Sequence, residues 1–147
     1  MIVLLAVAGC VGAEPEAQPL PVVGGVAAFV VTAQPVLTAR CANPSCHGNA
    51  ARPLSLFAVH RHRMDSADTF LDAPLTGAEE RHNFLQASAF LLGVDRAAHS
   101  LLLTQPLAVR AGGDGHAGVE VFADTEDFDY RRLRAWAATA LGEEEGP

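Results

Sequence analysis

Two cysteines and a histidine stand close together in the segment Cys41-Ala-Asn-Pro-Ser-Cys46-His47-Gly48. A histidine directly after the second cysteine suits covalent haem attachment, because the thiols add to the two vinyl groups while the adjacent imidazole reaches the iron from the same side. The usual spacing is C-x-x-C-H, and this chain has two additional residues, with Asn43-Pro44 predicting a turn that folds the extra length back. We therefore expect Cys41 and Cys46 to form the thioether bonds of haem c and His47 to be the proximal iron ligand.

The same residues allow two other interpretations. Cys41 and Cys46 could form a short-loop disulfide, with His47 as a surface residue. They could also be half of a zinc site, but zinc normally takes a second pair of ligands, and the sequence contains no other C-x-x-C or H-x3-H pair. Covalent haem remains the leading hypothesis.

A second histidine that is a candidate ligand is His116, inside Ala111-Gly-Gly-Asp-Gly-His-Ala-Gly118. Glycines let a backbone take positive φ angles and approach a flat ligand closely, so His116 is the first candidate for the distal iron ligand. Met64 is the alternative, since methionine is also an axial ligand of haem. An open distal position is a third possibility.

The elements that must position these residues are predicted to be helices. A short helix with Pro35 in its first turn leads to Cys41. Thr76 and Glu79 have the spacing of a capping box, which predicts a helix over 77–92, stopped by Gly93. A short buried helical turn is expected over 100–104, closed by Pro106.

The last predicted helix is the clearest. Asp124 or Thr125 can cap it, and acidic residues followed by arginines suit its dipole. Its apolar side chains recur at helical spacing and form one stripe toward the core: Tyr130, Leu133, Trp136, Ala137, Ala140 and Leu141. The remaining histidines, His60, His62, His82 and His99, are expected at the surface.

The N-terminal sequence predicts export and lipidation. Residues 1–9 are apolar and too few to span a bilayer, so they suggest a signal peptide, and Val7-Ala8-Gly9-Cys10 resembles a lipobox with Cys10 as the lipidated residue. A buried N-terminal strand is the alternative. Residues 10–21 contain several prolines and predict a flexible tether, followed by a folded domain over 22–141 and an acidic tail over 142–147.

Composition narrows the class of protein. The chain has 147 residues, which is enough for one domain, and a net charge of -7. All ten basic residues are arginines and they form no basic cluster, which argues against a nucleic-acid partner. No nucleophile elbow, phosphate-binding loop or carboxylate pair is recognisable, so we expect no enzyme activity.

Most of the mature chain resembles the small c-type cytochrome-like domains of exported proteins from myxobacteria and planctomycetes. The resemblance covers about residues 29–141 and depends on several short motifs: Gln34-Pro35-Val36-Leu37, Cys46-His47-Gly48, Ser100-Leu101-Leu102, Pro106-Leu107, Gly112-Gly113 before His116, and Asp129-Tyr130 with Leu133 and Trp136. In that pattern further glycines and a phenylalanine often follow the loop histidine, and here Gly118 and Phe122 follow His116.

The resemblance and the motifs together imply a mostly α-helical, single-domain, cytochrome c-like protein with one haem c. We expect a lipoprotein in the periplasm or at the outer membrane, bound to the membrane through Cys10, that passes single electrons between redox partner proteins. The alternative is a haem-free binding or structural module closed by a Cys41–Cys46 disulfide.

Overall fold

The computed structural model describes residues 25–117 and 119–143, and this part of the chain is mostly helical. It contains α1 (Gly25–Arg40), α2 (Gly77–Ala89), α3 (Leu101–Thr104) and α4 (Phe128–Leu141), joined by short 3-10 helices at Ser66–Phe70, Ala97–His99 and Val109–Ala111. No strand occurs within these ranges, only an isolated parallel bridge between Leu107 and Phe122. The prediction of a small, mostly α-helical domain is confirmed.

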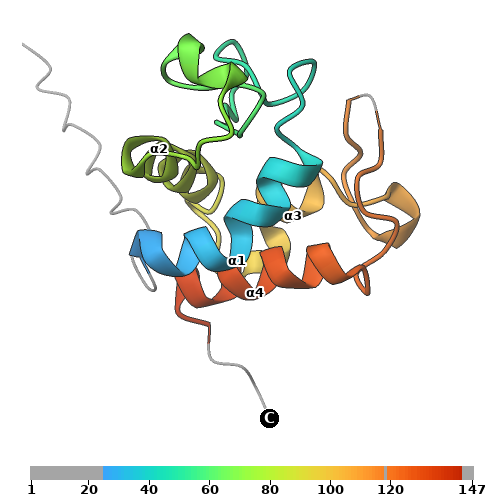
Figure 1. Cartoon of the computed structure of the whole chain (residues 1–147). Helices are drawn as coiled ribbons and strands as arrows, with labels where there is room; N and C mark the ends of the chain where they lie inside the picture. Colours follow the sequence, from blue (N-terminus) through green and yellow to red (C-terminus); the bar gives the residue numbers. More distant parts are fainter. Residues whose placement is uncertain (1–24, 118, 144–147) are drawn as a thin grey trace, which may run out of the picture.

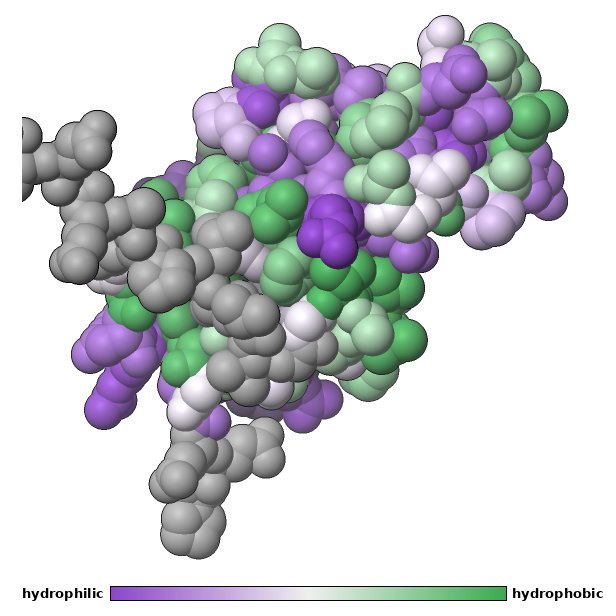
Figure 2. Space-filling view, turned by 90° about the vertical axis from the view of Figure 1, so that its left-hand side faces the viewer, coloured by the Kyte–Doolittle hydropathy of each residue, from purple (hydrophilic) through white to green (hydrophobic). Residues whose placement is uncertain are grey.

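Several sequence predictions fall on residues that the structure does not describe. They are the signal peptide over 1–9, the lipidation site Cys10, the tether over 10–21 and residues 144–147 of the acidic tail. None of the helices within 25–117 and 119–143 is long and apolar enough to cross a membrane. The face turned to the viewer in Figure 2 mixes hydrophilic and hydrophobic residues.

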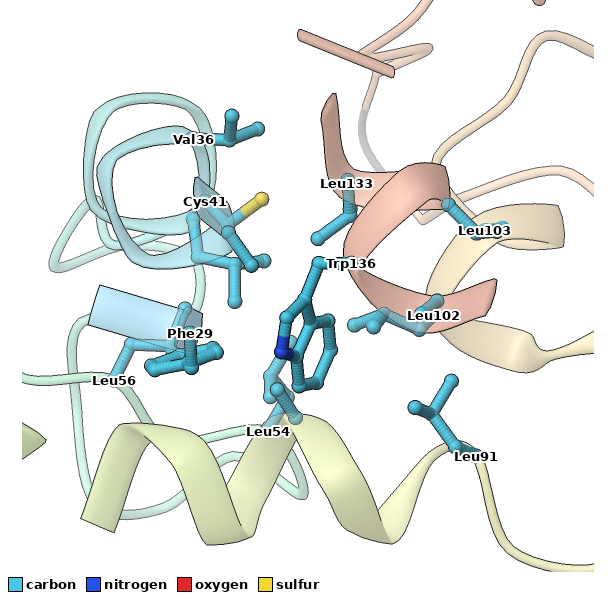
Figure 3. Packing of buried hydrophobic residues seen from close by; sticks show 14 of the residues in the cluster. Phe29, Val36, Cys41, Leu54, Leu56, Leu91, Leu102, Leu103, Leu133 and Trp136 are labelled. Carbon is cyan, nitrogen blue, oxygen red and sulfur yellow. The ribbon is translucent and has the colours of Figure 1, made fainter. Parts of the chain in front are cut away.

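The first and last helices of the domain pack together, and α2 also packs against α1 (Figure 1). Their contact is aromatic: the Phe29 ring lies 5.1 Å from the Trp136 ring and 5.8 Å from the Phe84 ring, both edge-on. Figure 3 shows the Trp136 indole in the middle of the core, with Phe29 on one side and Leu102 on the other. Each large apolar side chain buried in this way contributes about 1.5–3 kcal/mol. Trp136 is a core residue, as predicted.

Helix α1 is longer than the sequence predicted, and Pro35 lies in its interior, not in its first turn. Proline has no N–H, so the carbonyl four residues earlier, that of Val31, lacks its usual helical donor. Arg132 of α4 replaces that donor, because its Nη2 donates a hydrogen bond to Val31 O at 3.2 Å. The prediction was wrong because this donor comes from the other end of the chain.

Helix α2 begins as predicted and ends earlier. The capping box is present: Glu79 N donates to Thr76 Oγ1 at 3.3 Å, and Thr76 N donates to Glu79 Oε2 at 2.8 Å. The helix ends at Ala89 instead of residue 92, because Leu91 and Leu92 make the shorter i to i−3 hydrogen bonds of a tightened last turn. The left-handed Gly93, with φ +75°, then turns the chain away.

Helix α4 is capped by Asp127 and not by Asp124 or Thr125. Asp127 Oδ1 accepts hydrogen bonds from Asp129 N at 2.8 Å and Tyr130 N at 3.2 Å. Asp124 instead accepts from Glu126 N at 2.9 Å, in a turn before the helix. Both Asp124 and Asp127 satisfy backbone donors in this stretch, so residue type alone did not identify Asp127 as the cap.

The loop between α1 and α2 is fastened to α2 by a buried ion pair. Arg63 Nε and Nη2 donate to the two carboxylate oxygens of Glu79 at 2.9 and 3.0 Å, and the exposed fractions of the two side chains are 0% and 1%. Glu79 also accepts from Met64 N at 2.8 Å. Burial opposes the charged form of Glu79, but the hydrogen bonds from Arg63, Thr76 and Met64 outweigh it and lower its pKa to about 2.

Candidate functional site

A cavity of about 300 Å³ opens at the C-terminal end of α1, and four of the residues singled out from the sequence line it. They are Cys41, Cys46, His47 and His116. The rest of the wall is mainly apolar and comes from α1, α3, α4 and the segments around Pro53 and Val121: Leu37, Pro53, Leu54, Phe90, Leu101, Leu102, Pro106, Ala117, Val119, Val121 and Leu133. Two motifs that lie far apart in the sequence therefore face one cavity.

The cysteine motif follows α1 without a break, and its extra length is folded into a turn. Asn43 O accepts hydrogen bonds from Cys46 N at 2.8 Å and from Gly48 N at 2.9 Å. His47 N donates back to Cys41 O at 3.2 Å. These bonds confirm the predicted turn at Asn43-Pro44 and bring both cysteines and His47 to the same cavity.

Two glycines at the site have no room for a side chain. A Cβ on Gly48 would collide with the Ala42 carbonyl oxygen, so this glycine lets the cysteine turn close on itself. A Cβ on Gly113 would collide with the Leu107 carbonyl oxygen, so this glycine lets the loop that carries His116 lie against the chain after α3. Both positions need glycine because of close backbone approach.

The two thiols of the motif are free and differ in exposure. Cys41 has an exposed fraction of 8%, whereas Cys46 is half-buried. Burial, reinforced by the neighbouring Cys46 and opposed by Arg40, raises the pKa of Cys41 to about 12. Cys41 is therefore held as a neutral thiol at physiological pH.

His47 is oriented by the backbone of the segment that follows it. Its Nδ1 lies 2.9 Å from Leu54 O. A carbonyl can only accept, so Nδ1 carries the proton and Nε2 presents its lone pair to the cavity. Burial is the main cause that lowers the pKa of His47, with smaller contributions from His116 and Arg52, while the bond to Leu54 acts in the opposite direction. This neutral, oriented imidazole is the form that binds metals.

His116 faces His47 across the cavity. Their Nε2 atoms are 3.5 Å apart, and their ring centroids are 5.7 Å apart with the planes tilted by 57°. An imidazole nitrogen lies about 2 Å from a bound transition metal, so two ligands in line need their nitrogens about 4 Å apart. An opening of about half an ångström between His47 and His116 would admit one metal ion between them.

The donor set fits haem iron better than an isolated metal ion. Within residues 25–117 and 119–143, no group of three or more His, Cys, Asp or Glu side chains converges in a way that could hold a metal. A structural zinc site needs four such ligands around one point, and although Cys41, Cys46, His47 and His116 all line the cavity, no three of them converge in that way. Iron in haem needs only axial ligands from the protein, since the porphyrin nitrogens fill the other positions. The two opposed imidazoles, the two adjacent thiols and the apolar wall fit that group.

Met64, the alternative distal ligand, does not line the cavity. Its side chain has an exposed fraction of 57%, and its backbone N–H is held at the start of α2 by Glu79. Among the distal candidates from the sequence, the structure places His116 and not Met64 beside His47.

The other histidines differ from the prediction in part. His60 and His99 are exposed as expected, but His62 and His82 are half-buried against Phe57, with ring centroids at 4.7 Å in each case. His82 Nε2 also hydrogen-bonds Ser55 O at 3.0 Å. The surface assignment of these two was wrong because Phe57, whose ring contacts both, was not recognised as their partner.

Two contributors to the site were missed from the sequence. The Leu54 carbonyl that orients His47 is a backbone group and leaves no signal in residue types. Arg40 lines the cavity beside Cys41 and is held by Asp129 at 2.9 Å and Asp127 at 3.3 Å. An arginine directly before the first cysteine, together with acidic residues at the start of the last helix, was a readable signal for this pairing.

Compared with known proteins, the chain matches no family model, no curated protein and no solved structure at a significant level. The functional argument therefore depends on the geometry of the cavity.

Proposed function

We propose that this chain is a monohaem c-type cytochrome that carries single electrons. The observation that supports it best is the opposition of His47 Nε2 and His116 Nε2 at 3.5 Å in a cavity that both Cys41 and Cys46 line. As part of the same proposal, the protein is an exported lipoprotein in the periplasm or at the outer membrane, anchored through Cys10, with redox proteins as its partners.

Each residue of the cavity has a distinct role in this proposal. Cys41 and Cys46 form the thioether bonds, and His47 and His116 are the proximal and distal axial ligands. The Leu54 carbonyl keeps the proton of His47 on Nδ1, so that Nε2 stays free to bind. When bound, haem iron supplies a one-electron couple between its ferrous and ferric states.

The apolar wall and the ligand pair set the properties expected of that couple. The side chains of Leu37, Leu54, Leu102 and Leu133 give the cavity a largely apolar wall. Axial ligand identity and burial are the protein's main means of setting a haem potential, and a methionine ligand raises it. With His116 as the distal ligand we expect a lower potential than Met64 would give.

Haem staining of a denaturing gel tests the attachment. Thioether bonds survive denaturation, so protein matured with a haem-attachment system should give a stained band at its own mass. Cys41→Ser combined with Cys46→Ser should abolish the band, and His62→Ala, which alters an imidazole outside the cavity, should keep it. An unstained wild-type protein with both thiols blocked to alkylation would support the disulfide-closed, haem-free module instead.

The ferric absorption spectrum tests the distal ligand. A second imidazole gives low-spin iron, so His116→Ala should shift the spectrum toward a high-spin or water-bound form. Met64→Ala should leave it unchanged, because Met64 is exposed and outside the cavity. A change in spin state caused only by Met64→Ala would transfer the distal role to Met64.

A further inference from the structure

The two opposed imidazoles are held very differently. His47 Nδ1 donates to Leu54 O at 2.9 Å, whereas the buried Nδ1 of His116 has no hydrogen-bond partner among the described residues. A partner at the second ring nitrogen orients a ligating histidine and makes it a stronger donor, and its loss costs about 10- to 100-fold in metal affinity. His116 therefore has the weaker hold on a metal.

The backbone around His116 is also fixed only on its two sides. Before it, Gly113 N donates to Ala108 O at 3.1 Å and Asp114 N to Thr104 O at 2.9 Å, and after it Val121 N donates to Pro106 O at 3.0 Å. Between these anchors, residues 115–117 and 119–120 make no backbone hydrogen bond to the described part of the chain. His116 can therefore move away without breaking a backbone hydrogen bond of its own.

The cavity beside His116 suits a small uncharged molecule. Its lining includes Leu101 and Val119, whose exposed fractions are 52% and 64%, so apolar side chains border the cavity where it meets solvent. Apart from the histidines and thiols, Arg40 is the one ionisable residue in the lining within the described ranges, and two carboxylates already hold it. A charged ligand would lose its hydration there without a new partner, which is costly.

We propose that His116 is a displaceable ligand and that the site binds a small neutral π-acceptor molecule, of the class of CO and NO, in its place. The proposal depends on the haem-binding function above. In the exchange the bond from His116 Nε2 to iron breaks and a bond from the incoming molecule to iron forms, with no electron transferred and no proton required. His47 stays bound, because Leu54 O holds its ring.

The test is CO binding to the reduced holoprotein, followed by the shift of the Soret band. Because His116 must leave first, the observed rate for wild type should rise with CO concentration and then reach a plateau set by the departure of His116. His116→Ala should bind CO at least about tenfold more tightly, because no side chain has to leave first and every molecule can bind CO. Its observed rate should rise linearly with CO concentration. Added imidazole should restore the plateau to this variant.

His62→Ala is the matched control, because its imidazole also has a buried nitrogen without a partner among the described residues but lies outside the cavity lining. It should bind CO as wild type does. The proposal is overturned if reduced wild type keeps its spectrum in CO-saturated buffer while His116→Ala binds CO. It is also overturned if both bind with the same linear rate. A colourless protein overturns the proposed haem-binding function as well as this proposal, whereas a coloured protein with either of these CO results overturns this proposal alone.

Discussion

Replacing Glu79 by glutamine should be strongly destabilising although the side chains have nearly the same shape. Arg63 is fully buried, and its Nε and Nη2 both donate to the Glu79 carboxylate. In Glu79→Gln the buried charge of Arg63 loses both of its carboxylate hydrogen bonds and keeps only the more distant carboxylate of Asp68, whose Oδ2 lies 3.9 Å from Arg63 Nη2. Removing one partner of a buried ion pair costs about 3–5 kcal/mol, a large part of the total stability of about 5–15 kcal/mol that a domain has.

The lowered pKa of Glu79 corresponds to an effect of similar size, because it reflects the same contacts with Arg63. The pKa of Glu79 is lowered from 4.5 to about 2, and each pKa unit corresponds to about 1.4 kcal/mol, so ionised Glu79 contributes about 3 kcal/mol to the free energy of unfolding. Because the pKa of the folded state is the lower one, this contribution is complete above pH 4.5 and is lost as the pH falls toward about 2. Glu79→Gln should lack this component of the acid dependence.

Urea unfolding at neutral pH and at several pH values below 4.5 measures both effects. The neighbouring Glu80→Gln is the matched control, because Glu80 makes no ion pair among the described residues and should lose less than about 0.5 kcal/mol. A Glu79→Gln variant within 1 kcal/mol of wild type at pH 7, or one with the full acid dependence of wild type, would refute the reasoning.

Three further predictions concern the cysteines and the loop of His116. Cys10→Ser should release the protein from the membrane fraction with the domain still folded. The reason is that lipid chains bind the membrane by burying methylenes that contribute about 0.8 kcal/mol each. A wild-type protein that is already soluble after cell breakage would contradict the anchor. Gly113→Ala should cost more than about 2 kcal/mol in urea unfolding because its Cβ meets the Leu107 carbonyl, whereas Gly77→Ala, with open space around it, should be neutral or slightly stabilising. In haem-free protein treated with iodoacetamide at pH 8, mass spectrometry should detect alkylation of Cys46 before that of Cys41, because the pKa of Cys41 is raised to about 12. Equal alkylation rates of the two thiols would argue against the burial of Cys41.

Features set by neighbouring residues were predictable from the sequence. The Thr76–Glu79 capping box and the turn at Asn43-Pro44 each depend on side chains within a few residues, and both are present. The predicted end of that helix at Gly93 was wrong, because α2 already ends at Ala89. The apolar stripe of the last helix was also correct, because its period is a property of the helix itself.

Features that depend on distant partners were not predictable. The helix continues through Pro35 because Arg132 donates to Val31 O, and no local signal identifies that donor. His62 and His82 are half-buried instead of exposed because the Phe57 ring contacts both of them. At the site, the residue types identified His47 and His116, but only the fold placed their Nε2 atoms opposite one another and kept Met64 outside.

The contact between the first and last helices has a consequence for the order of events during maturation. Cys41 directly follows α1, and the neighbouring helix α4 ends at Leu141, so the motif is synthesised long before the helix that helps to enclose it. Until α4 docks, Phe29 lacks its contact with Trp136, and the cavity that Cys41 lines lacks the part of its wall that Leu133 provides. For the proposed haem attachment, this order of synthesis places the reaction at Cys41 between emergence of the motif and closure of the domain by its C-terminal helix.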